Sequence, residues 1–183
     1  MDSGAIGDKA IRVLLIDQDP AEYALIGQLL SAVGPNAYEL TWCRQSGHAL
    51  EAIAADLHDV ILLDYQSDRV KGSGLLAKAV QHNCTRPIIV MTDEMDRNVD
   101  REAIRSGASD YLIKGRIDSL VLERAIRYAI DRKEAELKLA RLAHYDPLTN
   151  VPNRILFRDR LQRAVERAPV SYTHLTLPTI HPW

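Results

Sequence analysis

The sequence predicts an α/β protein, a doubly wound sandwich built on a five-stranded parallel sheet, with a helical extension at its C-terminal end. Between residues 11 and 116, five short apolar runs alternate with longer amphipathic segments. Three of these runs are almost wholly apolar, as expected of strands that helices cover on both faces. After residue 116 the pattern changes to a long stretch without Pro or Gly, which is typical of one continuous helix.

The strands alternate with helix-length segments, and this order indicates crossover connections and therefore parallel pairing. The first helix has a clear start signal. Asp19 is expected to cap it, Pro20 to occupy its first turn, and Glu22 to complete a capping box. The five strands are expected at residues 13–16, 38–42, 60–63, 88–91 and 111–113.

The C-terminal part is predicted to be helical. A long helix is expected over residues 117–143, and a second over residues 153–168, after a break at residues 146–149. Within the long helix, four apolar residues follow an a/d-like spacing that Lys133 interrupts: Ile126, Ile130, Leu137 and Ala140. This spacing is typical of a short parallel coiled coil, and a solvated helical linker is the alternative.

Composition excludes several classes of function. The 183 residues contain 23 Lys and Arg against 25 Asp and Glu, a net charge of −2, so no concentrated positive field favours nucleic acid or an anionic membrane. Two cysteines are too few for a disulfide framework, and no signal peptide or bilayer-spanning run is evident. A cytoplasmic protein is expected.

Residues 1–10 are expected to be disordered, and residues 170–183 are interpreted as a tail foreign to the fold.

Chemically reactive side chains follow four of the five predicted strands: Asp17, Asp64, Thr92 and Lys114. Ligands of an open parallel sheet bind outside the carboxyl ends of its strands, so one pocket is expected to gather these groups. Clustered carboxylates repel unless a cation offsets their charge, and Mg²⁺ with its preference for oxygen ligands is the natural partner. Asp64 is a candidate nucleophile that forms an acyl phosphate. The pocket therefore predicts a phosphoryl acceptor.

Four stretches carry a family resemblance, namely RVLLIDQDP, DVILLDY, PIIVMT and GASDYLIKG. In order and spacing, residues 12–116 resemble the receiver domain of bacterial two-component response regulators. The resemblance implies a flavodoxin-like fold with strand order 2-1-3-4-5. It also implies Mg²⁺ as cofactor, and a phosphoryl group taken from a histidine kinase or phosphotransfer protein.

The resemblance also assigns roles by position. Asp64 would be the phosphorylated aspartate, Asp17 an acidic-pocket residue and Lys114 the lysine that contacts the phosphoryl group. Thr92 would be the switch hydroxyl and Tyr111 the switch aromatic.

Two further positions bear on the metal. The backbone carbonyl of Gln66 would contact Mg²⁺. Gln18 stands where the family usually has a second acid, one that commonly touches the metal, so its neutral amide is expected to weaken Mg²⁺ binding. Asp19 is interpreted as a helix cap rather than as a replacement for that acid.

A second resemblance covers residues 143–168. The run DPLTNVPNR, from Asp146 to Arg154, is similar to the D-x-L-T-G-L-P-N-R opening of a GGDEF domain, with Asn150 in place of the usual Gly; Asn also tolerates a positive φ. No Gly-Gly-Asp-Glu-Phe-like run occurs, and the segment is far shorter than a domain of about 100 residues. The chain is therefore not expected to be an enzyme, and cyclic di-GMP synthesis would belong to a longer parent protein.

These resemblances imply a domain order: a receiver over residues 11–116, a fifth helix that continues as a signalling linker over 117–143, and an incomplete GGDEF start over 144–169. Phosphorylation would repack the face formed by the fourth helix, the fifth strand and the fifth helix, and a homodimer through this face and the linker would pass the change on.

Two other functions remain as alternatives. The first, motivated by Gln18, is a receiver-like dimerisation module that is never phosphorylated. The second is a small flavodoxin-type redox protein. The acids after the first and third strands disfavour it, because a flavin phosphate favours amide-rich turns.

Overall fold

The computed structural model describes residues 10–65, 74–82, 84–93, 103–146, 148–149 and 151–167. The chain forms two compact units, Met1–Ala135 and Glu136–Trp183. Of the predictions above, those on Gln66 and on residues 1–9 and 170–183 lie outside the described residues.

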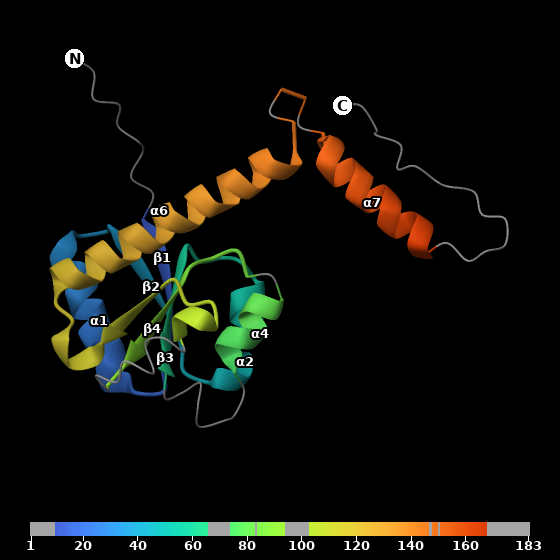
Figure 1. Cartoon of the computed structure of the whole chain (residues 1–183). Helices are drawn as coiled ribbons and strands as arrows, with labels where there is room; N and C mark the ends of the chain where they lie inside the picture. The colour runs from blue at the N-terminus through green and yellow to red at the C-terminus, as the bar shows by residue number, and fades with distance from the viewer. Residues whose placement is uncertain are drawn as a thin grey trace, which may run out of the picture. The chain divides into compact units, whose positions relative to one another are not determined.

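The first unit is built on a five-stranded parallel sheet in the order β2-β1-β3-β4-β5, as Figure 1 shows in part. The two central strands β3 and β4 are buried at every position, which is why their sequences are continuous apolar runs rather than alternating ones. The predicted fold class and strand order are confirmed. The strands are β1 (Ile11–Ile16), β2 (Tyr38–Cys43), β3 (Val60–Asp64), β4 (Ile88–Thr92) and β5 (Asp110–Ile113).

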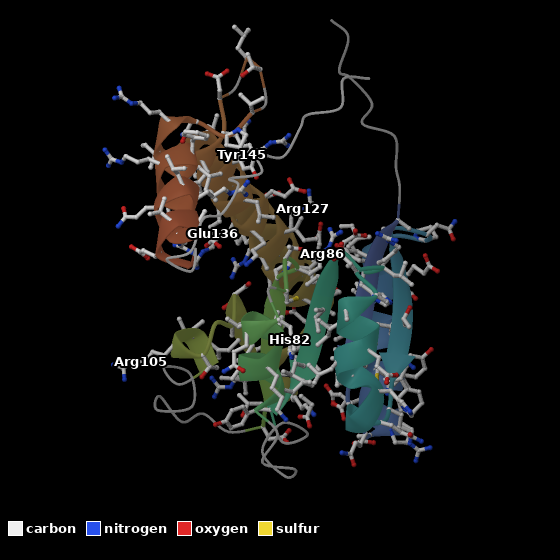
Figure 2. All side chains as sticks on the ribbon, turned by 90° about the vertical axis from the view of Figure 1, so that its right-hand side faces the viewer. His82, Arg86, Arg105, Arg127, Glu136 and Tyr145 are labelled. Carbon is white, nitrogen blue, oxygen red and sulfur yellow. The ribbon has the colours of Figure 1, made fainter. Side chains whose placement is uncertain are left out.

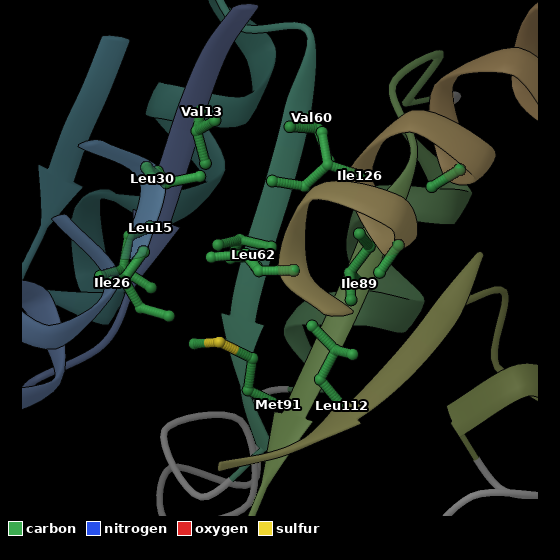
Figure 3. Packing of buried hydrophobic residues seen from close by; sticks show 13 residues of the cluster. Val13, Leu15, Ile26, Leu30, Val60, Leu62, Ile89, Met91, Leu112 and Ile126 are labelled. Carbon is green, nitrogen blue, oxygen red and sulfur yellow. The ribbon is translucent and has the colours of Figure 1, made fainter. Parts of the chain in front are cut away.

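Helices cover both faces of the sheet (Figure 1). Successive strand side chains point to opposite faces, so the core divides into two clusters. In the first, Leu15 and Leu62 pack against helices α1 (Pro20–Val33) and α6 (Ser119–His144), as Figure 3 shows. In the second, Leu14 and Leu63 pack against α2 (Ser46–Ala54) and α4 (Leu75–Gln81). Full burial of such side chains stabilises the fold by about 1.5–3 kcal/mol each.

Charged side chains join the amino ends of three adjacent strands. Arg12 in β1 makes a bidentate contact with Asp59, which immediately precedes β3, at 3.0 and 3.3 Å. Arg86, labelled in Figure 2, lies just before β4 and binds Asp56 at 2.6 and 3.0 Å. A longer contact of 4.0 Å links Arg86 to Asp59. Ion pairs of this kind, with two parallel hydrogen bonds, fix relative orientation as well as adding energy.

The long helix α6 begins two residues later than predicted and runs without interruption to His144, so its prediction as one continuous helix is confirmed. The coiled-coil interpretation of the a/d-like spacing is wrong for its first two residues. Ile126 is fully buried in the first core cluster and Ile130 packs against that cluster, so neither belongs to a coiled-coil seam. Only the later residues of the series, such as Leu137 with 45% of its surface exposed, face away from a core.

The second unit contains a tight connection and helix α7 (Arg154–Arg167), which agrees with the predicted second helix. Tyr145 and Pro152 form an isolated antiparallel bridge. Asn153 starts the helix, because its side-chain oxygen accepts hydrogen bonds from the N–H groups of Ile155 and Leu156 at 3.0 and 3.1 Å. Its side-chain nitrogen donates to the carbonyl of Ala143 at 2.7 Å, which ties the end of α6 to the start of α7.

Asp146 organises this connection. Its Oδ1 atom accepts three hydrogen bonds, from the N–H of Leu148 at 3.1 Å and from the N–H and hydroxyl of Thr149, both at 2.9 Å. The bond from the Thr149 N–H is the main cause that holds the pKa of Asp146 below its ordinary value of 3.8. Among the described residues of the predicted break, Leu148 and Thr149 are therefore held by the carboxylate of Asp146.

This turn should loosen in acid. A folded-state pKa below the unfolded value means that the stabilisation is present above pH 3.8 and is lost as the pH falls through the lowered pKa. We expect the backbone amide signals of Leu148 and Thr149 to titrate together in NMR spectra, with a midpoint below 3.8. Asp146→Ala should abolish this titration, whereas Asp159→Asn, on α7, should leave it unchanged. A midpoint above 3.8 would contradict the assignment.

Two smaller findings complete the fold. Within the described ranges, no helix is both long and apolar enough to cross a membrane. Cys43 and Cys84, the two cysteines, are partly buried and not disulfide-bonded, and burial raises the pKa of each thiol.

Candidate functional site

The buried polar side chains of the described residues gather at one edge of the sheet. Asp17 directly follows β1, Asp64 ends β3 and Thr92 ends β4; they are 3%, 4% and 2% exposed, and the other fully buried side chains are hydrophobic. Because the strands are parallel, their carboxyl ends meet at this edge. Burying polar groups is unfavourable unless partners satisfy them, so their concentration at one edge marks a functional site rather than a packing solution.

Lys114 bridges the two buried carboxylates. It follows β5 at the start of the short 3₁₀ helix η1 (Lys114–Arg116), and its Nζ atom lies 2.8 Å from Oδ2 of Asp17 and 2.8 Å from Oδ1 of Asp64. Burial alone would lower the pKa of this ammonium, but the hydrogen bonds and charges of Asp17 and Asp64 outweigh burial and raise it. Lys114 is therefore held in its charged form between the two acids.

The loop after β1 holds Asp17 in place. The Oδ1 atom of Asp17 accepts a hydrogen bond from the N–H of Asp19 at 2.9 Å. The indole N–H of Trp42, in β2, donates to the backbone carbonyl of Asp17 at 2.8 Å, and the Trp42 ring stacks on Tyr23 of α1 with centroids 4.6 Å apart. Asp17 is thus fixed through both its side chain and its main chain, so its second oxygen is presented to Lys114 in a defined direction.

Asp19 occupies the N-cap position of α1, and its carboxylate accepts a hydrogen bond from the N–H of Ala21 at 2.8 Å. The capping-box prediction is wrong for Glu22. In a capping box, the Glu22 carboxylate would accept a hydrogen bond from the backbone N–H of the N-cap residue Asp19. That N–H donates to the Asp17 carboxylate instead. Glu22 Oε1 is instead buried, without a hydrogen-bond partner among the described residues.

Glu22 therefore joins the pocket, a role that the sequence analysis missed. Burial is the largest cause that raises the pKa of its carboxyl; the charge of Lys114 lowers this pKa, while those of Asp17 and Asp93 raise it further. These neighbours come from the loops after β5, β1 and β4. The sequence signal for this role is an acid in the first turn of the helix that follows β1. A capping box accounts for the same acid, so the sequence alone does not distinguish the two roles.

The remaining predicted residues lie around this centre. Gln18 is exposed, at the rim, where it lines a cavity of about 410 Å³ with Arg44, Gln45 and Gly47. Tyr111 is half-buried in β5, and its register partner in β4 is Val90. A separate cavity of about 480 Å³ lies beside α2 and α4, and none of the predicted site residues lines it.

The donor set suits a hard divalent ion. In the part of the chain that the structure describes, no three His, Cys, Asp or Glu side chains stand close enough together to hold an ion by themselves. Mg²⁺ does not need such a cage, because it is usually bound by one or two carboxylates and keeps several waters. Asp17 and Asp64 supply two carboxylates, and Lys114 contacts both. Glu22 adds a third carboxylate, whose Oε1 atom has no hydrogen-bond partner among the described residues. The residues present fit Mg²⁺.

Comparison with known proteins agrees with this geometry. Residues 13–127 match the model of the response regulator receiver domain. The chain is 29% identical over 127 residues to Regulatory protein AtoC of Escherichia coli, an alignment that covers 67% of this chain and 27% of that protein. It is 33% identical over 118 residues to Response regulator PleD of Caulobacter vibrioides, covering 63% of this chain and 25% of that protein.

Solved structures are similar as well. The signal receiver domain of an HD domain-containing protein from Pseudomonas fluorescens superposes with a TM-score of 0.61 at 26% identity, covering 74% of this chain and 98% of that one. The chain spans 27% and 25% of the length of the two curated relatives named above. Fold, site and family match lead to one conclusion: this chain belongs to the family of response regulator receiver domains.

Proposed function

We propose that this receiver accepts a phosphoryl group on Asp64, delivered by a histidine kinase or phosphotransfer protein. One observation carries the proposal: the Lys114 ammonium lies 2.8 Å from buried carboxylate oxygens of both Asp17 and Asp64, at the carboxyl edge of the sheet. Two acids buried beside one lysine add little stability beyond what apolar residues of similar size would give, because replacement of the whole group by such residues is often neutral or stabilising. Its retention in the core is explained by phosphoryl transfer.

In the proposed reaction, a carboxylate oxygen of Asp64 attacks the phosphorus of the donor's phosphohistidine. A P–O bond forms and the P–N bond breaks, and the imidazole nitrogen keeps the bonding electron pair. The product is an acyl phosphate on Asp64. Lys114 exchanges its contact with Asp64 for one with the phosphoryl oxygens and neutralises part of their charge. Mg²⁺, when bound, supplies further positive charge at these oxygens; Asp17 and Asp64 would hold it, with Gln66 as a backbone ligand by family resemblance.

The response to phosphorylation would run through Thr92 and Tyr111. The modification adds a charge of about −1.5 to −2 and new acceptor oxygens. Thr92 ends β4 and Asp64 ends the neighbouring strand β3, which supports our proposal that the Thr92 hydroxyl donates to the phosphoryl group. Tyr111 is half-buried, and we expect it to turn inward when Thr92 moves. Residues 94–102, which precede β5 in the chain, lie outside the described residues.

We further propose that the signal leaves through α6 and a homodimer. The face that contains β5 and the start of α6 would repack on phosphorylation. Since Ile126 and Ile130 pack in the receiver's own core, a coiled-coil contact would use the exposed part of α6 from Leu137 onward.

The proposed output is a GGDEF module that begins at the turn after α6. The motif residues Asp146, Thr149 and Asn153 make side-chain hydrogen bonds in the turn and at the start of α7, which supports this proposal. We propose a receiver over residues 11–116, a linker helix over 117–143 and a GGDEF start over 144–169. The chain itself would act in the cytoplasm as a phosphoacceptor rather than an enzyme, and a longer parent would make cyclic di-GMP.

The test is intact-mass spectrometry after incubation with acetyl phosphate and Mg²⁺. We expect one phosphoryl adduct on the wild-type chain, which disappears when Mg²⁺ is chelated, and no adduct on Asp64→Asn. Asp131→Asn, at an exposed position of α6, is the matched control and should be modified like the wild type.

Two outcomes would contradict the proposal. An adduct that persists on Asp64→Asn would place the modification elsewhere. No adduct on a wild-type chain that is folded by circular dichroism would favour the phosphorylation-independent dimerisation module.

A further inference from the structure

Glu22 carries a carboxylate in an unusual position. It lies in the first turn of α1, where an acid is ordinarily exposed or bonded back to the N-cap. Here the N–H at the cap donates to Asp17 at 2.9 Å, and the Oε1 atom of Glu22 is buried without a hydrogen-bond partner among the described residues. A buried carboxylate oxygen without a donor is unfavourable, because it loses its hydration and gains nothing in return.

The surroundings of Glu22 show what it faces. The charged groups that act on its carboxylate are Lys114, Asp17, Asp93 and Asp19, which all belong to the loops at the carboxyl edge. Lys114 lies within 2.8 Å of Asp17 and of Asp64, and no ion pair between it and Glu22 is formed. Glu22 therefore places a carboxylate with one buried oxygen among the charges of the pocket, and the pocket's lysine contacts Asp17 and Asp64 rather than Glu22.

By the family resemblance, position 18 in the loop before α1 usually carries a second acid of this pocket. Gln18, immediately after Asp17, is neutral and exposed. Asp17, Asp64 and Lys114, which contact one another, leave one net negative charge, and Glu22 adds a second, so the pocket carries an excess of negative charge that a divalent cation would offset. Gln18 is thus uncharged at the position where the family usually has an acid. Glu22, in the helix that follows, has a carboxylate oxygen that is buried without a partner among the described residues.

We propose that Glu22 takes over the role of the acid that is absent at position 18, where this chain has Gln18. Its carboxylate supplies the additional negative charge that favours Mg²⁺ binding in this receiver. The inference rests on the proposed function. Since no three acidic side chains of the described part cluster closely enough to ligate an ion directly, Glu22 acts through water molecules of the hydrated ion, which Mg²⁺ usually retains. It is a positioning residue for the metal, and Asp17 and Asp64 remain the carboxylates nearest to Lys114.

The experiment is a Mg²⁺ titration by isothermal calorimetry on the full chain, in the absence of any phosphodonor. Glu22→Gln keeps the shape of the side chain and removes its charge. We expect it to weaken Mg²⁺ binding by about tenfold, within the range typical of residues that support metal ligands indirectly. Glu51→Gln, an exposed position on α2, is the control and should bind like the wild type.

The double variant Gln18→Asp/Glu22→Gln separates this role from a structural one. If Glu22 replaces the missing acid, the new Asp at position 18 should restore the affinity to within about twofold of the wild type. Thermal unfolding without Mg²⁺ should show Glu22→Gln to be at least as stable as the wild type, because the variant removes the charge of a half-buried carboxylate whose Oε1 atom is buried without a partner among the described residues.

The outcomes distinguish the two proposals. Wild-type binding together with equal binding by Glu22→Gln would overturn the role of Glu22 and leave the receiver function standing. Weak binding that Gln18→Asp fails to rescue would also overturn it, as a structural effect. A wild-type chain that neither binds Mg²⁺ nor gains a phosphoryl adduct would overturn the proposed function itself, and the inference with it.

Discussion

Replacement of Lys114 by methionine is expected to lower the free energy of unfolding by about 3 to 5 kcal/mol at neutral pH, the range measured when one partner of a buried ion pair is removed. Methionine keeps most of the apolar stem, so the change removes mainly the ammonium. Asp17 and Asp64, which are 3% and 4% exposed, would then lie buried near each other without the cation that now contacts both. Chemical denaturation followed by circular dichroism measures the loss.

Mg²⁺ should restore part of that stability in Lys114→Met, because a divalent ion supplies the charge that the lysine supplied. The matched control is Lys78→Met, an exposed position on α4, which should change the free energy of unfolding by less than about 0.5 kcal/mol. A Lys114→Met variant that is as stable as the wild type and indifferent to Mg²⁺ would show that the ion pairs contribute nothing to the folded state.

The same contacts give the wild type an alkaline limit. The folded-state pKa of Lys114 is raised above its ordinary value of 10.5, so the contribution of its charge to stability is complete below pH 10.5 and is lost as the pH rises through the raised pKa. The free energy of unfolding should therefore fall above pH 10.5 in the wild type. Lys114→Met should show a smaller decline over the same range.

Gly107→Ala is expected to destabilise the receiver by about 2 to 4 kcal/mol, through two separate causes. Gly107 has a φ of +103°, a conformation that residues with a Cβ rarely adopt. A Cβ at this position would also lie 2.6 Å from the Cγ2 atom of Val80 on α4, well inside van der Waals contact. Urea denaturation of the variant and the wild type measures the difference.

Two further variants separate these causes. Gly107→Ala combined with Val80→Ala removes the steric contact and should recover only that part of the loss, since the backbone strain remains. Gly47→Ala, in α2, has no atom within 4 Å of the added Cβ and should be neutral or stabilising by up to about 1 kcal/mol. Equal stability of Gly107→Ala and the wild type would exclude both causes.

The sequence predicted the part of the site that depends on strand position. Asp17, Asp64, Thr92 and Lys114 each stand at or directly after the end of an apolar run, and parallel pairing forces such ends to one edge of the sheet. The distances could not be predicted in this way. That a single Lys114 ammonium lies between Asp17 and Asp64 depends on the twist of the sheet and on the length of the lysine side chain.

Three other features required the tertiary structure. Glu22 fits a capping box in the sequence. Only the structure shows that the N–H of Asp19, which Glu22 would bind in such a box, donates to Asp17 instead. Ile126 has a spacing that suits either a coiled coil or a helix packed on a sheet, because the periods of 3.5 and 3.6 residues hardly differ over a few turns. The close approach of Gly107 to Val80 joins segments that are distant in sequence.

The ion pairs of Arg12 and Arg86 divide the sheet into a fixed end and an adaptable end. They hold the starts of β1, β3 and β4 together, while the opposite ends of the same strands meet around charges that one lysine balances. The ion pairs at the amino edge share no residue with the carboxyl edge, so a rearrangement there would not have to break them. The proposed modification of Asp64 would therefore leave the ion pairs at the amino edge in place, and the domain would stay folded while its carboxyl edge rearranges.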